Sequence, residues 1–364
     1  MNDLQHIISL PARRHHASNV PSASRGFSIT ELIVVIGIIA LLAGLLLAAL
    51  RTVRATALST TTASTMQSFS QACDAFFTDH GFYPGILPEE VLATETVQDS
   101  GGNQIAFTTT QNALLHLMGG YRVLQPGQNN NNPMHPAQVD YNAFRAANPG
   151  SIELAVGGGG SQWRLAIALN RIGEGPVING KVYVPYFTPG PREVAVAKGK
   201  IEDGGLGLPD LLDAWGQPII YLRQARTTGP LVGAPADRPQ YYLANNGNWG
   251  ALRGYMESTG LGELGFNQSI SILNQNTGND RIHTLAQIIR HPAFGLAAAN
   301  SANLPDFRAR GAYVLISAGK DGIFFSQDDG PGSRQNPVTN IRTGANGNPT
   351  IVREYDDVLI FGGG

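Results

Sequence analysis

The feature that most constrains this chain is a run of 19 residues without a polar side chain, LIVVIGIIALLAGLLLAAL at positions 32–50. Counted from Phe27, the segment covers 24 positions, which is roughly 36 Å of helix at about 1.5 Å per residue. That length crosses a hydrocarbon layer of about 30 Å with some tilt. A secretory signal peptide has a shorter apolar region of about 7–15 residues, followed by a small-residue cleavage site. Here Arg51-Thr52-Val53-Arg54 follows, so we expect residues 27–50 to form one transmembrane helix.

One acidic residue, Glu31, lies near the start of this segment. A carboxylate inside an apolar span costs about 2.5 kcal/mol or more on insertion scales, so it usually has a partner. The residues ahead of the segment are polar and basic, and they end in Arg25-Gly26-Phe27. An ordinary uncleaved anchor does not account for this combination.

The segment resembles the amino-terminal signal of type IV pilins and type II secretion pseudopilins. That motif is a basic leader, a glycine, a phenylalanine, a glutamate at the fifth mature position and some twenty apolar residues, and Gly26, Phe27 and Glu31 match it position for position. The resemblance implies that a prepilin peptidase and N-methyltransferase removes residues 1–26 as a leader peptide and methylates the amino group of Phe27. The mature chain would then have 364 − 26 = 338 residues.

The same resemblance implies a place and a set of partners. The chain would lie in the bacterial inner membrane as a single-pass protein, with a cytoplasmic amino terminus and a periplasmic head. It would contact membrane lipid, an inner-membrane assembly platform, copies of itself and other pilins or pseudopilins. In a fibre, the freed amine of Phe27 in one subunit would neutralise Glu31 of its neighbour, and the low dielectric would strengthen that pairing.

Residues 51–80 continue the helical pattern in a more polar setting. An apolar stripe recurs at steps of three and four, formed by Met66, Phe69, Cys73, Phe76 and Phe77. No proline interrupts the chain from Phe27 to Gly81, and Gly81 followed by Pro84 is typical of a helix end. We expect one helix of about 54 residues, roughly 80 Å long, whose second, periplasmic half packs on the head. Cys73, the only cysteine, is expected to be a buried apolar side chain of this stripe.

Residues 81–364 form the expected globular head. Helices are predicted over 111–118 and 162–171, and strands over 181–187, 219–223, 240–244, 312–317 and 358–361. The segment Asp213-Ala214-Trp215-Gly216-Gln217-Pro218 resembles a segment of major pseudopilins in which the tryptophan anchors the core, which implies that role for Trp215. QNNNNP at 128–133 and GGGG at 157–160 indicate loops, and 85–210 and 224–310 are expected to be large loop-rich insertions.

Aspartates cluster near the carboxy terminus. Ser317-Ala318-Gly319-Lys320-Asp321-Gly322 is followed by Asp328 and Asp329, which resembles the calcium loop of major pseudopilins and implies Asp321, Asp328 and Asp329 as ligands. Calcium takes six to eight oxygen ligands, including carboxylates and carbonyls. A second pair, Asp356-Asp357, precedes Val358-Leu359-Ile360 and fits the end of that motif equally well, so either pair is a candidate for the site. Solvated turn aspartates are the alternative.

Other classes of function receive little support. The net charge of −2 offers no basic surface for nucleic acid, and neither an HExxH pair nor a GxSxG elbow occurs. A GxGxxG match at 260–265 lacks the strand and helix that a dinucleotide site requires. We therefore expect no enzyme. The expected fold is α+β and pilin-like, a long amino-terminal helix packed on an antiparallel sheet. The expected function is a fibre subunit of type II secretion, with two alternatives: a type IV pilin for adhesion, motility or DNA uptake, and a membrane-anchored binding module that does not polymerise.

Overall fold

A computed structural model covers the chain, and it describes the following residues: 28–89, 92, 97–102, 104–105, 107–123, 141–156, 163–196, 207–226, 271, 287–293, 309–326, 328, 330, 332–333, 336–337 and 355–363. The predicted strand at 240–244 and both predicted loops at 128–133 and 157–160 lie outside these residues, as does most of the segment 224–310. The chain divides into two units, residues 1–53 and residues 54–364.

One helix dominates the amino-terminal part of the chain. Helix α1 runs without interruption over Ile29–His80, 52 residues. It ends where the sequence predicts, since Gly81 takes a left-handed φ of +75° and its N–H donates to the Phe77 carbonyl at 2.7 Å. Within residues 1–53, the apolar side chains of α1 are exposed, for example Leu41 at 66% and Leu45 at 64%. By length and composition, this is the one helix among the described residues that could cross a membrane.

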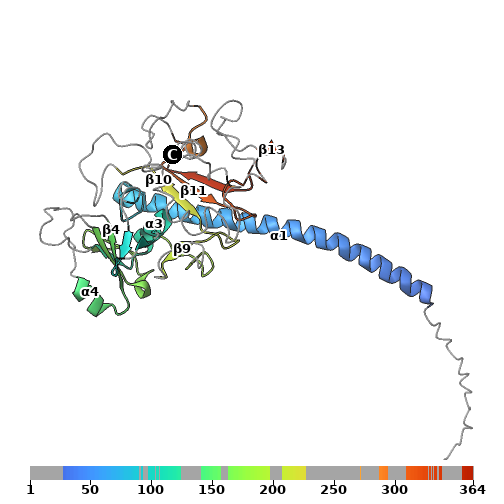
Figure 1. The fold of residues 1–364 in the computed structure, drawn as a ribbon, viewed down its shortest axis with the longest axis horizontal. Helices are drawn as coiled ribbons and strands as arrows, with labels where there is room; N and C mark the ends of the chain where they lie inside the picture. The colour runs from blue at the N-terminus through green and yellow to red at the C-terminus, as the bar shows by residue number, and fades with distance from the viewer. Residues whose placement is uncertain are drawn as a thin grey trace, which may run out of the picture. The chain divides into compact units, whose positions relative to one another are not determined.

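Within residues 54–364, the second part of α1 packs on a three-stranded antiparallel sheet (Figure 1). The strands are β10 (Ile220–Arg223), β11 (Tyr313–Ser317) and β14 (Val358–Gly362), in the order β10-β11-β14. The stripe of α1 faces this sheet: Met66, Phe69, Cys73 and Phe76 are fully buried, and they share a core with Tyr221 and Tyr313. Phe77, predicted to belong to the stripe, is instead 41% exposed. The three strands were expected from their aromatic and β-branched residues, and the structure confirms them.

A second, five-stranded antiparallel sheet occupies part of the region expected to be loop-rich. Its order is β2-β1-β4-β5-β3. Its strands are β1 (Val97–Asp99), β2 (Gln104–Ile105), β3 (Tyr121–Val123), β4 (Ile152–Val156) and β5 (Trp163–Ile167). The helix predicted over 162–171 is therefore wrong, because strand β5 followed by the 3₁₀ turn η1 (Leu169–Arg171) stands there. The physical reason is that β5 is an inner strand paired on both sides, with Leu165 and Ile167 buried on one face and Ala166 on the other.

Helix α3 (Thr109–Met118) joins the two sheets, and it confirms the helix predicted at 111–118. It starts with a capping box between Thr108 and Gln111. Leu114 and Leu117 belong to the core under α1, whereas Leu115 belongs to the core of the five-stranded sheet. Nearly every residue of this short helix is buried, so α3 lies in the interior of the unit 54–364.

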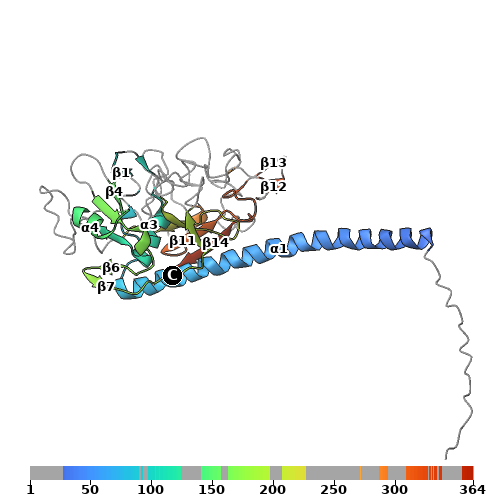
Figure 2. The same ribbon diagram turned by 90° about the horizontal axis from the view of Figure 1, so that it is seen from below.

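The remaining described elements are short. They are the helix α4 (Tyr141–Ala147), the pair β6 (Val177–Ile178) and β7 (Lys181–Val182), the pair β8 (Val194–Val196) and β9 (Pro209–Leu211), and the pair β12 (Gly332–Ser333) and β13 (Asn336–Pro337). The β6–β7 hairpin lies beside the carboxy-terminal end of α1 (Figure 2), where Tyr183 meets the ring of His80. The strand predicted over 181–187 is thus reduced to two residues. Pro185 has no N–H to extend the pairing.

Candidate functional site

The start of α1 is held by a reciprocal cap. The backbone N–H of Ser28 donates to Glu31 Oε2 at 2.9 Å, and the Ser28 hydroxyl donates to the same oxygen at 3.0 Å. In return, the backbone N–H of Glu31 donates to Ser28 Oγ at 3.2 Å. This is the capping-box arrangement, and the spacing Ser-x-x-Glu in the sequence is its signal. Gly26 and Phe27, the predicted cleavage and methylation residues, lie outside the described residues.

The cap leaves part of the Glu31 carboxylate available. Both bonds from Ser28 go to Oε2, and no donor among the described residues reaches Oε1. A carboxylate has about four lone-pair positions on two oxygens, so it can accept from a second partner without losing the first. The residues around Glu31 on α1 are exposed and apolar, and they offer no competing cation.

The segment that resembles the pseudopilin tryptophan motif forms a tight turn before β10. Its organising residue is Asp213, whose Oδ1 accepts from the backbone N–H groups of Trp215 at 2.9 Å and Gln217 at 2.8 Å. Burial raises the pKa of Asp213, while these bonds oppose the rise. The turn is tied to α1, because the N–H of Ala214 donates to the buried Thr62 hydroxyl at 3.0 Å. Trp215 itself is only half-buried and lies outside the buried core clusters of the described residues.

The aspartate-rich loop follows β11 and meets the residues that precede β14. Since Ser317 pairs with Val358 across these strands, Gly319–Asp321 and Asp356–Asp357 are neighbours in space. The N–H of Lys320 donates to Asp356 Oδ2 at 3.1 Å. The two candidate aspartate pairs that the sequence left open are therefore at one site, except that Asp329 lies outside the described residues. The loop also joins the tryptophan turn, through a 2.7 Å bond from the Ser317 hydroxyl to Asp213 Oδ2.

Each described aspartate of the loop has a different environment. The carboxylate of Asp357 accepts from the Phe325 N–H at 2.9 Å and so supports a residue with an unusual left-handed φ of 51°. Asp321 Oδ1 accepts from the Ile323 N–H at 2.8 Å. Asp328 is exposed. Burial, together with the charges of Asp356 and Asp328, raises the pKa of Asp321 to about 6. The charges of Asp356 and Asp328 therefore disfavour the ionised form of Asp321.

The loop meets several requirements of a cation site. Asp356 Oδ1 is buried and has no hydrogen-bond partner among the described residues. Gly319 has a φ of +68°, and a side chain there would meet the Asp356 carboxylate at 2.6 Å, so the backbone comes close to that oxygen. No group of three or more His, Cys, Asp or Glu side chains in the described part of the chain could hold a metal alone. Backbone carbonyls and water would have to complete the shell, as calcium allows.

Comparison with known proteins adds no relative: no family model, no curated protein and no solved structure matches this chain.

Proposed function

We propose that this chain is a prepilin-type subunit of a helical fibre, cleaved after Gly26 and methylated on Phe27, and most closely a type II secretion pseudopilin. The observation that carries the proposal is the Gly26-Phe27-x-x-x-Glu31 motif, whose glutamate lies in the first turn of one continuous helix of 52 residues. The first part of that helix is apolar and exposed, and the stripe in its second part is buried on an antiparallel sheet. One element would then combine membrane anchoring with head packing, which is the arrangement a pilin-like subunit needs.

Assembly follows from the chemistry of Glu31. Within one subunit, Ser28 occupies Oε2 and stabilises the first turn of α1. The amine that cleavage frees on Phe27 of a neighbour would bind Oε1, and both charges would be neutralised in a medium where neither is well solvated. A charge pair at the amino-terminal end of each helix sets the axial offset between subunits. The cap and the pairing use different oxygens, so the helix keeps its cap in the fibre.

The secretion assignment rests on the head. The tryptophan turn and the aspartate loop resemble two segments of major pseudopilins, and Ser317 and Asp213 link them by a direct hydrogen bond. We propose that the loop binds Ca²⁺ through Asp321 and Asp356, with carbonyl groups of the loop. Bound calcium would offset the burial and the neighbouring negative charges that raise the pKa of Asp321. In a chain with one cysteine, it would fasten β14 to β11 where no disulfide can.

The assembly role is tested with Glu31→Ala in the full-length chain, produced together with a prepilin peptidase and an assembly platform. We expect cleavage to proceed and fibre recovery to fall at least tenfold. Ser28→Ala is the matched control, because it removes the two cap bonds of the Ser28 hydroxyl but keeps the Glu31 carboxylate, and we expect fibres to persist. Normal fibres from Glu31→Ala, or loss of fibres in both variants alike, would contradict the pairing role.

A further inference from the structure

Three large apolar side chains are exposed among the described residues of the unit 54–364. They are Phe77 at 41%, Val182 at 69% and Val184 at 80%. Scattered apolar residues are ordinary on a protein surface, but these three gather in two places. Phe77 lines a cavity, and the two valines lie in β7 and just after it. Both places are at the carboxy-terminal end of α1, so we compared what each presents to a partner.

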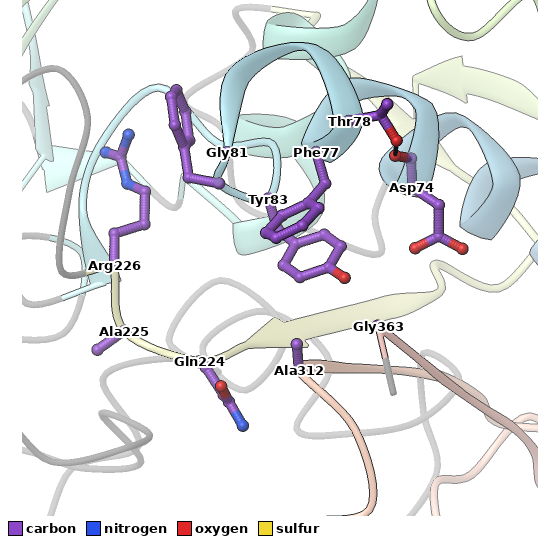
Figure 3. A pocket seen from close by; sticks show the side chains of 11 residues that line it. Asp74, Phe77, Thr78, Gly81, Tyr83, Gln224, Ala225, Arg226, Ala312 and Gly363 are labelled. Atoms are coloured by element: carbon purple, nitrogen blue, oxygen red, sulfur yellow. Dashed lines mark hydrogen bonds between the residues drawn. The ribbon is translucent and has the colours of Figure 1, made fainter.

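The cavity has a volume of about 550 Å³ and lies beside the last turns of α1 (Figure 3). Its aromatic wall consists of Phe77 and Tyr83, which stack with ring centroids 4.6 Å apart and an angle of 21° between their planes. Tyr83 is held in place by an edge contact with Tyr313 at 4.9 Å. The volume falls within the range of about 300–1,000 Å³ that is typical of binding pockets. A fixed aromatic wall of this kind suits aliphatic side chains of a partner.

A negative charge lies next to the aromatic wall. Figure 3 shows the carboxylate of Asp74 near the hydroxyl of Tyr83, and Asp74 is exposed. Its Oδ1 accepts from the Tyr313 hydroxyl at 3.2 Å, which fixes the carboxylate without using the second oxygen. None of the ion pairs between described residues involves Asp74. The cavity therefore suits a partner that brings apolar side chains together with a cation.

The β6–β7 hairpin is a rigid projection. Its turn residues Asn179 and Gly180 have left-handed φ values of 51° and 78°, as a tight two-residue hairpin turn requires. Ile178 is buried in the core under α1. The ring of Tyr183 packs against that of His80, with centroids 4.8 Å apart. The tip thus extends from a fixed base, so little conformational entropy is lost when it enters a contact.

The exposed side of the hairpin carries two valines and a lysine. Val182 and Val184 alternate with Tyr183 along the chain, so they point away from the ring that packs on α1. Lys181 is exposed, and its Nζ lies 4.7 Å from the centre of the Tyr183 ring. No described carboxylate forms an ion pair with Lys181, and its flexible stem can carry the ammonium to a stronger partner. The hairpin presents the apolar groups and the cation that the cavity suits.

Hairpin and cavity lie on different sides of α1. Asp74, Phe77 and Thr78, at steps of three and four, form the face of α1 that lines the cavity. Asp79 is two residues beyond Phe77, which is about 200° around the helix. There it accepts at 2.6 Å from the hydroxyl of Tyr186, which follows the hairpin. The helix thus separates the two surfaces, and the hairpin of one copy can reach only the cavity of another.

We propose that the β6–β7 hairpin of one copy enters the cavity of the next, with both valines on the aromatic wall and Lys181 paired with Asp74. This inference rests on the proposed function, because it adds a contact between heads to the charge pair in the membrane. The two surfaces differ, so the contact is head-to-tail, and a repeated head-to-tail contact that does not close builds a helical filament. It covers all three exposed apolar side chains at once.

The first test is disulfide crosslinking of the full-length chain, in membranes that contain a prepilin peptidase and an assembly platform. Thr78→Cys places a thiol in the cavity lining, and Val184→Cys places one on the hairpin. Cys73 is fully buried and stays in place. We expect oxidation to give a ladder of dimers and higher multimers only when one chain carries both substitutions. Ala75→Cys with Val184→Cys is the matched control, since Ala75 is exposed on α1 outside the cavity, and it should give no ladder.

The second test reverses the charges. Lys181→Asp and Asp74→Lys should each lower fibre recovery at least tenfold, and the double variant should restore most of it. Both residues are exposed, so either substitution leaves the core of the head intact. Cleavage after Gly26 should proceed in all three variants, because the hairpin and the cavity take no part in it.

The outcomes separate this contact from the fibre role itself. Fibres without a ladder would overturn the contact and leave the proposed function standing. A ladder without fibres would support the contact and contradict the fibre role, and the absence of both would contradict both. A crosslink from Thr78→Cys to a different protein, in place of the ladder, would also overturn the contact. Failure of the double charge reversal to restore fibres would overturn the pairing of Lys181 with Asp74.

Discussion

The packing of α1 on the head can be measured at Phe69. This side chain is fully buried, and it makes edge contacts with Phe187 at 5.3 Å and Tyr221 at 5.6 Å between ring centroids. Replacing a buried phenylalanine by alanine costs about 3–5 kcal/mol through lost transfer energy and the cavity left behind. The two aromatic contacts place Phe69→Ala in the upper half of that range, at about 4 kcal/mol.

A matched control lies two turns further along the same helix. Phe77 is also a phenylalanine of α1, but it is 41% exposed and stacks on one ring, that of Tyr83. Its replacement by alanine removes less buried area and opens no enclosed cavity, so we expect a loss of about 1 kcal/mol. The two substitutions have the same helix-propensity cost, and their difference therefore reports packing alone.

The assay is urea unfolding of the detergent-solubilised chain, followed by tryptophan fluorescence. All three tryptophans belong to residues 54–364. With a slope of about 3 kcal/mol per molar urea, Phe69→Ala should lower the midpoint by about 1.3 M and Phe77→Ala by about 0.3 M. Equal midpoints for the two variants would refute the burial of the stripe formed by Met66, Phe69, Cys73 and Phe76.

Two further predictions concern the aspartate loop. Adding Ca²⁺ at a hundredfold excess over its Kd should stabilise the full chain by about 2.7 kcal/mol, and EDTA should reverse this gain. Asp356→Asn should abolish the response to Ca²⁺. A melting temperature that changes with neither calcium nor chelator would contradict calcium binding at this loop. Without calcium, the pKa of Asp321 is about 6 in the folded chain, against an ordinary value of 3.8. Because the folded-state pKa is raised, the contribution of Asp321 to stability is fully present below pH 3.8 and is lost as the pH rises through about 6. Asp321→Asn should flatten this part of the stability profile between pH 4 and pH 7, and an unchanged profile would show that neither burial nor the charges of Asp356 and Asp328 raise the pKa of Asp321 in the folded chain.

The elements that the sequence predicts best are those with a strong local signal. Helix α1 has an unbroken apolar pattern and a glycine at its end, and its residues 66, 69, 73 and 76 share one buried face. Strands β10, β11 and β14 are rich in aromatic and β-branched residues, which fit a sheet surface. These elements can be predicted from the sequence because the residues that form the apolar pattern are the ones buried in the structure.

The sequence does not predict the five-stranded sheet, because its strands are short and their pairing is not local. Strands β1 and β2 have three and two residues, too few for an alternating pattern to be recognised. The sequence predicts a helix at β5 because Leu165, Ala166 and Ile167 are all apolar, and such a run has no period that distinguishes a buried strand from a helix. Whether such a segment forms a strand or a helix depends on its contacts with segments that are distant in the sequence.

The candidate sites also differ in how far the sequence predicts them. Glu31 and the aspartate loop were visible as motifs, and their residues are adjacent in sequence or at strand ends. The sequence does not reveal a cavity of about 550 Å³ beside the end of α1, because its lining comes from residues 74, 77, 78, 81–83, 224–226, 312 and 363. Arg226 lies in a segment without any motif, and only the fold shows that its guanidinium is buried beside Phe82 with two unused donors.

The mass of the mature protein, isolated from its native membrane, tests the central proposal most directly. We expect intact-mass and amino-terminal peptide analysis to show a chain of 364 − 26 = 338 residues that begins with N-methylated Phe27. A chain that still begins at Met1, with its basic leader attached and Phe27 unmodified, would contradict the prepilin assignment.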